Sequence, residues 1–137
     1  MVLQTSGRTQ DTYVLIVEDD ESLALVLEKS LELTQVKTRT ASNGEEALNL
    51  IRQSPPAAII LDLMMPVMSG FSLLLELASD PAGRTIPVIV MSALSHYRSI
   101  MDKLPGNVVG VMPKGSSSLG ELQALLVKAN VLRETAA

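Results

Sequence analysis

The chain alternates short apolar runs with segments of helical periodicity, and this alternation restricts its fold more than any other feature. Five runs are predicted as strands: 13–17, 36–41, 57–61, 86–91 and 108–112. Four of them are almost continuously apolar, which is typical of strands buried on both faces of a parallel sheet. A segment with apolar residues every three or four positions follows each run and predicts a helix. The sequence therefore predicts an α/β fold with helices on both faces of the sheet.

Polar residues indicate where some of these helices begin. Asp20 precedes the helix expected over 21–33 and is a good N-cap, because its carboxylate accepts hydrogen bonds from unpaired backbone N–H groups. Ser42 and Glu45 have the spacing of a capping box at the start of the next helix. The helix expected over 70–79 has more apolar residues than one buried face needs, which favours either deep burial or an apolar edge that contacts a partner.

Composition narrows the class of protein. The chain has 137 residues, a net charge of −4 and no cysteine. One domain is expected over 12–133, between a flexible N-terminal tail over 1–11 and a C-terminal tail over 134–137. The acidic balance argues against nucleic acid as a direct partner, and the absence of cysteine excludes disulfides and zinc–thiolate sites. No segment resembles a signal peptide or a membrane span, so we expect a soluble, cytoplasmic protein.

Charged and hydroxyl side chains follow the predicted strands at the points where four of them end. These residues are Glu18, Asp19, Asp62, Ser92 and Lys114. Because the carboxyl ends of parallel strands meet at one edge of a sheet, we expect the five side chains to converge there. Each residue alone is more often an ordinary turn, cap or surface residue. Their joint placement at the ends of different strands indicates a site.

The expected charges at this edge indicate a chemistry. Three carboxylates at close range repel one another, and a hard divalent cation such as Mg²⁺ relieves that repulsion. A carboxylate can also act as a nucleophile and form an acyl phosphate. With Lys114 to neutralise charge, the set suits phosphoryl transfer, in which positioning and charge stabilisation provide most of the catalysis.

Five segments resemble the response-regulator receiver family of two-component signalling, of the chemotaxis-regulator type. They are VLIVEDDES (14–22), SNGEEAL (42–48), IILDLMMPVMSG (59–70), PVIVMSA (87–93) and VMPK (111–114). The segment around Asp62 is the specific one, and the others support it. The resemblance covers nearly the whole chain. It implies a flavodoxin-like (βα)5 fold with the five parallel strands in the order 2-1-3-4-5.

The resemblance also implies a role for each site residue. Asp62 would be the phosphoacceptor, and Asp19, Asp62 and the backbone carbonyl of Met64 would bind Mg²⁺. Glu18 would hold a metal-bound water. Ser92 and Lys114 would contact the phosphoryl group, and Ser92 would report its presence.

The partners implied are a sensor histidine kinase or phosphotransfer protein and a downstream protein. The downstream protein would bind the face made by the fourth helix, fifth strand and fifth helix, and the chain would be a monomer or weak dimer. No direct contact with nucleic acid or membrane is expected. The chain would not be an enzyme beyond its own phosphorylation and dephosphorylation.

Two residues depart from the family pattern at the possible switch surface. Val111 stands where receivers often have an aromatic ring, and Gly115 stands where they usually have proline after the lysine. These departures leave open an alternative function, a receiver-fold interaction module in which phosphorylation is weak or unused.

Two enzyme classes fit less well. A haloacid-dehalogenase-type phosphatase needs a second acid two residues after its nucleophile, and Met64 occupies that position. A P-loop enzyme needs a GxxxxGK[ST] motif, which the sequence lacks.

Overall fold

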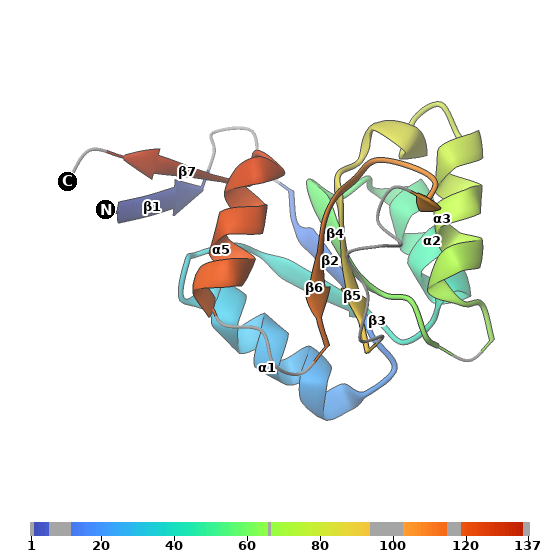
Figure 1. The fold of residues 1–137 in the computed structure, drawn as a ribbon, viewed down its shortest axis with the longest axis horizontal. Coiled ribbons are helices and arrows are strands. Elements are labelled where there is room, and N and C mark those ends of the chain that lie inside the picture. The colour runs from blue at the N-terminus through green and yellow to red at the C-terminus, as the bar shows by residue number, and fades with distance from the viewer. Residues whose placement is uncertain (1, 6–11, 66, 94–102, 115–118, 136–137) are drawn as a thin grey trace.

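The computed structural model describes residues 2–5, 12–65, 67–93, 103–114 and 119–135. Within these ranges the elements in chain order are β1 (Val2–Thr5), β2 (Val14–Val17), α1 (Glu21–Glu32), β3 (Thr38–Ala41), α2 (Gly44–Gln53), β4 (Ala58–Asp62), α3 (Gly70–Ser79), the 3₁₀ helix η2 (Gly83–Thr85), β5 (Val88–Ser92), β6 (Val108–Pro113), α5 (Leu119–Lys128) and β7 (Leu132–Thr135). Figure 1 shows a central sheet with helices on both sides.

The central sheet has five parallel strands in the order β3-β2-β4-β5-β6. This is the predicted order 2-1-3-4-5, because β2 to β6 are the five predicted strands taken in chain order. Every residue of β2, β4 and β5 is buried, as expected for strands covered on both faces. The predicted flavodoxin-like fold is therefore confirmed.

Two separate cores hold the helices to the sheet. Side chains of α2 and α3 pack on one face of the sheet, with Leu15, Ile59 and Val90 beneath them. Side chains of α1 and α5 pack on the other face. Alternate residues of a strand point to opposite faces, so β2, β4, β5 and β6 contribute to both cores, whereas β3 contributes only Ala41 to the first. The sheet is thereby held between two helical layers (Figure 1).

The predicted helix starts are right in one case and wrong by one residue in another. The Asp20 side chain caps α1 by accepting hydrogen bonds from the N–H groups of Ser22 and Leu23. At α2 the cap is Asn43, which accepts from Glu46 N, and not the predicted Ser42. Glu46 accepts hydrogen bonds from the backbone N–H and the hydroxyl of Ser42, the residue before the cap, so the predicted Ser42–Glu45 box is replaced by contacts of Asn43 and Glu46. The reason is that Asn43 has the extended backbone that an N-cap requires and caps at least as well as serine.

The helix predicted over 70–79 is confirmed as α3, and its surplus of apolar residues divides into two groups. Leu73, Leu74 and Leu77 are buried, whereas Phe71 and Leu75 are exposed. The helix predicted after the fourth strand run falls mostly outside the described residues.

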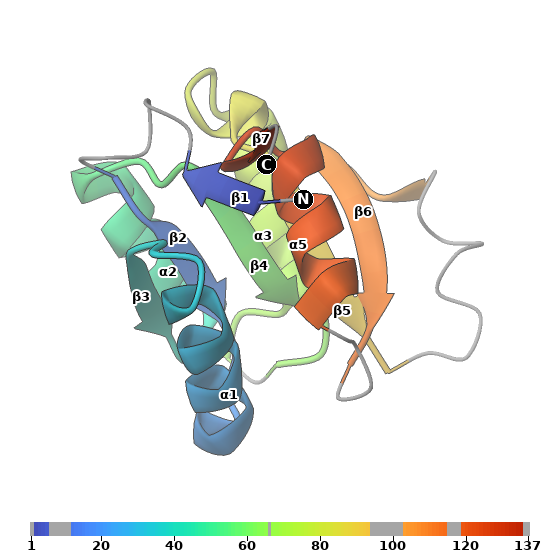
Figure 2. The same ribbon diagram turned by 90° about the vertical axis from the view of Figure 1, so that its left-hand side faces the viewer.

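The two ends of the chain form an element that the sequence pattern did not reveal. Strand β1 pairs antiparallel with β7 in a two-stranded sheet separate from the central one. The two strands lie side by side near α5 (Figure 2). Residues 2–5 were expected to belong to a flexible tail, and in the structure they form this strand. Their pairing depends on partners 127 to 133 positions away in the chain, which local periodicity cannot show.

Among the described residues, no helix has both the length and the apolar character needed to span a membrane.

Candidate phosphoacceptor site

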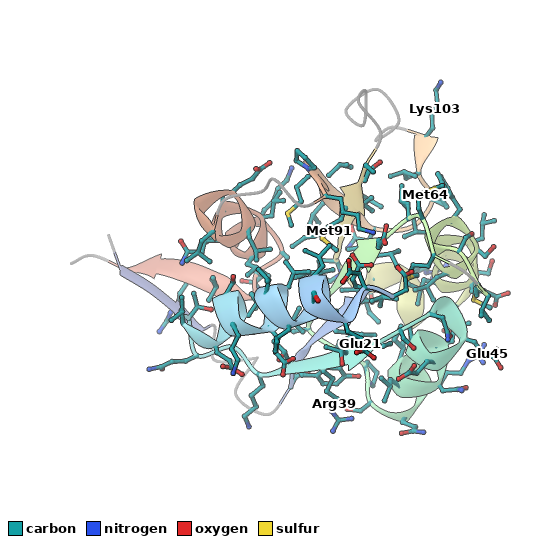
Figure 3. The ribbon with its side chains drawn as sticks, turned by 90° about the horizontal axis from the view of Figure 1, so that it is seen from below. Glu21, Arg39, Glu45, Met64, Met91 and Lys103 are labelled. Carbon is teal, nitrogen blue, oxygen red and sulfur yellow. The ribbon has the colours of Figure 1, made fainter. Side chains whose placement is uncertain are left out.

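The site lies at the carboxyl edge of the central sheet, where four strands deliver its residues. Glu18 follows β2, Asp62 ends β4, Ser92 ends β5 and Lys114 follows β6. Backbone hydrogen bonds continue beyond the strands at two of these points, from Glu18 N to Ala41 O and from Lys114 N to Ser92 O. Because these bonds extend the parallel ladders, the site side chains leave the sheet at defined positions. Met64 lies on the loop after β4 (Figure 3).

Three carboxylates and one ammonium group meet at this edge. Single side-chain oxygens of Glu18, Asp19 and Asp62 all lie within 4.8 Å of one another. Lys114 Nζ lies 2.6 Å from Asp62 Oδ2 and 3.4 Å from Glu18 Oε1. Glu18 and Asp62 are buried, and Asp19 is exposed. The structure thus brings together four of the five residues predicted from the strand ends.

Backbone N–H groups hold two of the carboxylates. The N–H of Met64 donates to Asp62 Oδ1 at 3.0 Å, and the N–H of Asp20 donates to Glu18 Oε2 at 3.3 Å. Glu18 Oε1 is buried and accepts no hydrogen bond from the described residues. This atom is paired with the Lys114 ammonium at 3.4 Å but without a hydrogen bond, so it keeps the capacity to bind a ligand that enters the site.

The electrostatics of the site oppose full ionisation of its acids. Burial, followed by the hydrogen-bonding and charge effects of Asp62 and Asp19, raises the pKa of Glu18 from 4.5 to about 8. Burial by itself would lower the pKa of the Lys114 ammonium, but the carboxylates of Asp62 and Glu18 outweigh that effect and raise it. The cluster therefore holds more negative charge than Lys114 alone can balance.

The residues present fit a magnesium ion. All the side-chain donors are carboxylate oxygens, which Mg²⁺ prefers, and one of them has no hydrogen bond of its own. A divalent cation would favour the ionised form of Glu18, which burial and the neighbouring acids Asp62 and Asp19 disfavour. The carbonyl of Met64 remains a predicted ligand, since no contact of that atom with the cluster supports or opposes it.

Gly70 contributes to the site in a way that the sequence analysis missed. A Cβ at this position would lie 2.5 Å from the backbone oxygen of Asp62 and 2.6 Å from Leu63 Cα. Gly70 N also donates to Leu63 O at 3.1 Å. The start of α3 therefore packs directly on the backbone of Asp62 and Leu63. The only signal in the sequence was a glycine soon after a strand end, and this signal does not specify the contact.

The remaining predicted residues lie around this centre. Ser92 is buried at the end of β5, beside the residue that precedes Lys114 in the β5–β6 register. Val111 is half-buried and packs against the core under α2 and α3. Gly115 lies outside the described residues, so its part in the switch surface stays a prediction.

Comparison with known proteins identifies the family. A family model described as the response regulator receiver domain matches residues 14–126. The chain belongs to this family. As a receiver, it is similar to a signal receiver domain of a histidine kinase from Syntrophus aciditrophicus, with a TM-score of 0.77 and 32% identity over 87% of this chain and 89% of that one.

Two further relatives bear on the metal site and on how much of a longer protein this chain matches. The receiver domain of sensor histidine kinase PA1611 from Pseudomonas aeruginosa PAO1 has a TM-score of 0.76 and 25% identity, over 87% of this chain and 97% of its own. That structure has a magnesium ion coordinated in its active site cleft. The probable transcriptional regulator ycf27 of Guillardia theta is 38% identical over 97 residues, which are 71% of this receiver and 36% of that protein. The receiver thus spans little more than a third of that relative.

Proposed function

We propose that Asp62 accepts a phosphoryl group from the phosphohistidine of a sensor histidine kinase or phosphotransfer protein, with Mg²⁺ in the acidic cluster. The observation that carries this proposal is the 2.6 Å contact between Lys114 Nζ and Asp62 Oδ2 beside two further carboxylates. An ammonium group next to a carboxylate nucleophile offsets the negative charge that an incoming phosphoryl group brings.

Each residue of the site has a defined part in this transfer. Asp19, Asp62 and the backbone carbonyl of Met64 would hold the ion directly and Glu18 would hold it through a water, and the ion when bound neutralises charge on the phosphoryl oxygens. An Asp62 oxygen attacks phosphorus, and the P–N bond of the phosphohistidine breaks as the new P–O bond forms, so that imidazole leaves. The Met64 N–H orients the Asp62 carboxylate through Oδ1. Lys114 moves from Asp62 Oδ2 to the transferred phosphoryl oxygens.

The output of the receiver follows from the same strands. Ser92 lies at the end of β5, next to β6, so a movement of its hydroxyl towards the phosphoryl group can be passed to β6 and to α5, which packs against it. A downstream protein would bind there, with the chain acting as a monomer or weak dimer in the cytoplasm. Val111 cannot supply an aromatic ring for this relay, so packing contacts must carry it.

The test is phosphorylation of the purified chain by acetyl phosphate in the presence of Mg²⁺, followed by intact-mass measurement. We expect a gain of one phosphoryl group that is lost in Asp62→Asn and in Asp19→Asn. Asp80→Asn is the matched control, because Asp80 only caps the end of α3 and a nearby turn. Absence of any Asp62-dependent mass gain would instead support the interaction module that does not use phosphorylation.

The chain would catalyse only its own phosphorylation and dephosphorylation, and the latter slowly. The residue two positions after Asp62 is the apolar, exposed Met64, which cannot orient an attacking water. The residue two positions after Ser92 is Leu94, which is also apolar and lies outside the described residues. We expect the phosphoprotein to persist for minutes or longer after removal of acetyl phosphate, and loss within seconds would contradict this.

A further inference from the structure

Val67 combines two properties that a valine rarely has together. Its φ angle is 69°, in the left-handed region that β-branched residues avoid, and its side chain is 79% exposed. The backbone conformation costs energy because the branched Cβ crowds the main chain. The exposed side chain recovers almost none of that cost by burial. Valine is therefore a poor choice for this position on grounds of stability.

The turn itself explains the backbone conformation but not the residue. The carbonyl of Met68 accepts a hydrogen bond from Gly44 N at 3.2 Å, and Ser69 then caps α3. A left-handed residue at 67 directs the chain into these contacts. Glycine or asparagine adopts this conformation at lower cost. The valine side chain thus needs an explanation outside the fold.

The position of Val67 suggests one. It belongs to the loop that leads from Asp62 to α3, and the bond between Met68 and Gly44 holds this loop at the carboxyl edge of the sheet. Met64, on the same loop, is 60% exposed. Asp62 is itself fully buried, so a protein that delivers a phosphoryl group must approach across the loops that surround it. Two exposed apolar side chains on one such loop are available to that protein.

We propose that Val67, with Met64, is a docking contact for the phosphohistidine-bearing protein and contributes to the choice of phosphodonor. This inference rests on the proposed function and goes beyond it by assigning a recognition residue. Because Glu18, Asp19 and Asp62 leave little positive charge at this edge, an apolar contact provides attraction that does not depend on charge. The occupant is a protein surface with an apolar patch next to its phosphohistidine.

The experiment compares a protein phosphodonor with a small one. Each sensor histidine kinase of the source organism is phosphorylated with ATP and mixed with the wild-type chain, and the kinase with the fastest transfer is used. Val67→Gly and Val67→Asn remove the valine but retain a residue suited to the turn. Gln35→Gly is the matched control, because Gln35 is exposed, has a φ of 63° and follows α1, at the opposite end from the site.

We expect both Val67 variants to lower kcat/KM for transfer from the kinase about fivefold, the usual loss when a contact of moderate importance is truncated. Labelling by acetyl phosphate should be unchanged, because that donor is too small to touch Val67. The midpoint of thermal unfolding should not fall, and in Val67→Gly it should rise. Gln35→Gly should leave both labelling rates unchanged.

Other results would overturn the proposal. Unchanged transfer from the kinase, or an equal decrease with acetyl phosphate, would show that Val67 is not a docking contact. A change in sedimentation with unchanged transfer would assign the loop to a second copy of the chain. If acetyl phosphate labels Asp62 but no kinase does, the docking proposal fails while the phosphoacceptor chemistry stands. If neither donor labels Asp62, the proposed function itself fails.

Discussion

The two ends of strand β2 differ in how their buried polar side chains are paired. Tyr13 lies just before the strand and Glu18 just after it, and both are buried. The Tyr13 hydroxyl donates to the carbonyl of Ser54, and the Arg39 guanidinium lies over the tyrosine ring at 4.9 Å from its centre. Glu18, in contrast, has a buried oxygen that accepts no hydrogen bond from the described residues. The buried hydroxyl at the amino end is therefore hydrogen-bonded, whereas the buried Glu18 oxygen at the carboxyl end is held by an ion pair with Lys114 at 3.4 Å without a hydrogen bond.

Within this one strand, the amino end contributes to stability and the carboxyl end contributes to the site. At the amino end, burial raises the pKa of Tyr13 and Arg39 opposes it, so the phenol stays neutral and paired. At the carboxyl end, three acids are held close together with one ammonium group. Such an arrangement costs stability in the absence of a cation and prepares the site for one. The comparison predicts that changes at the two ends have opposite consequences.

The largest effect is expected where α3 touches the site. Gly70→Ala would place a methyl group against the backbone of Asp62 and Leu63, which cannot move without disturbing β4. We expect a loss of about 3 kcal/mol in the free energy of unfolding, at the upper end for overpacking, together with loss of acetyl phosphate labelling. Chemical denaturation and intact-mass measurement would check both effects.

A glycine elsewhere provides the control for Gly70. Gly120→Ala, at an exposed position in α5, should be neutral or stabilising, because alanine has the higher helix propensity. If Gly70→Ala were as stable and as active as Gly120→Ala, the close contact of Gly70 with the backbone of Asp62 would be unimportant for stability and for phosphorylation.

The next effect concerns the charge on Glu18. Its pKa of about 8 in the folded protein lies above the ordinary 4.5, so between these values the folded protein holds a proton that the unfolded chain has lost. The free energy of unfolding of the metal-free protein should therefore fall as pH rises from about 5 to about 8. Glu18→Gln should remove this slope and should stabilise the metal-free protein by about 1–3 kcal/mol at pH 9, where the wild-type acid is charged.

Magnesium gives a second measurement of the same group. Saturating Mg²⁺ should flatten the pH slope of the wild type, since the cation favours the ionised carboxylate. Mg²⁺ should have a smaller effect on the free energy of unfolding of the Glu18→Gln variant. A wild-type curve that rises with pH in the absence of metal would mean that Glu18 is ionised throughout and that the carboxyl end is not destabilised.

The smallest effect is expected at the amino end. Tyr13→Phe removes one hydroxyl and leaves the carbonyl of Ser54 without that donor, so the free energy of unfolding should fall by about 1 kcal/mol. Acetyl phosphate labelling should be unchanged, because Tyr13 lies at the far end of the sheet. A decrease in labelling by Tyr13→Phe would show that the two ends are coupled through β2.

Much of this fold could be predicted, because the relevant signals are local. Runs such as Ile59 to Leu61 are apolar without interruption, which is typical of a short strand buried on both faces. The convergence of Glu18, Asp62 and Lys114 followed from parallel strands alone. The start of α2 was misplaced by one residue, because serine and asparagine are both good caps and only the backbone conformation selects Asn43.

The sequence by itself determined the class of fold and the place of the acidic site, since both depend on residue type and on spacing along the chain. The order of the core strands was implied only by the resemblance to receivers, and the structure confirms it. Only the tertiary structure decided the pairing of β1 with β7, the contact of Gly70 with Asp62 and the strained, exposed state of Val67. These depend on which atoms meet across the fold or on a single backbone angle. A pattern of apolar and polar residues specifies neither the contacts between distant atoms nor the value of one backbone angle.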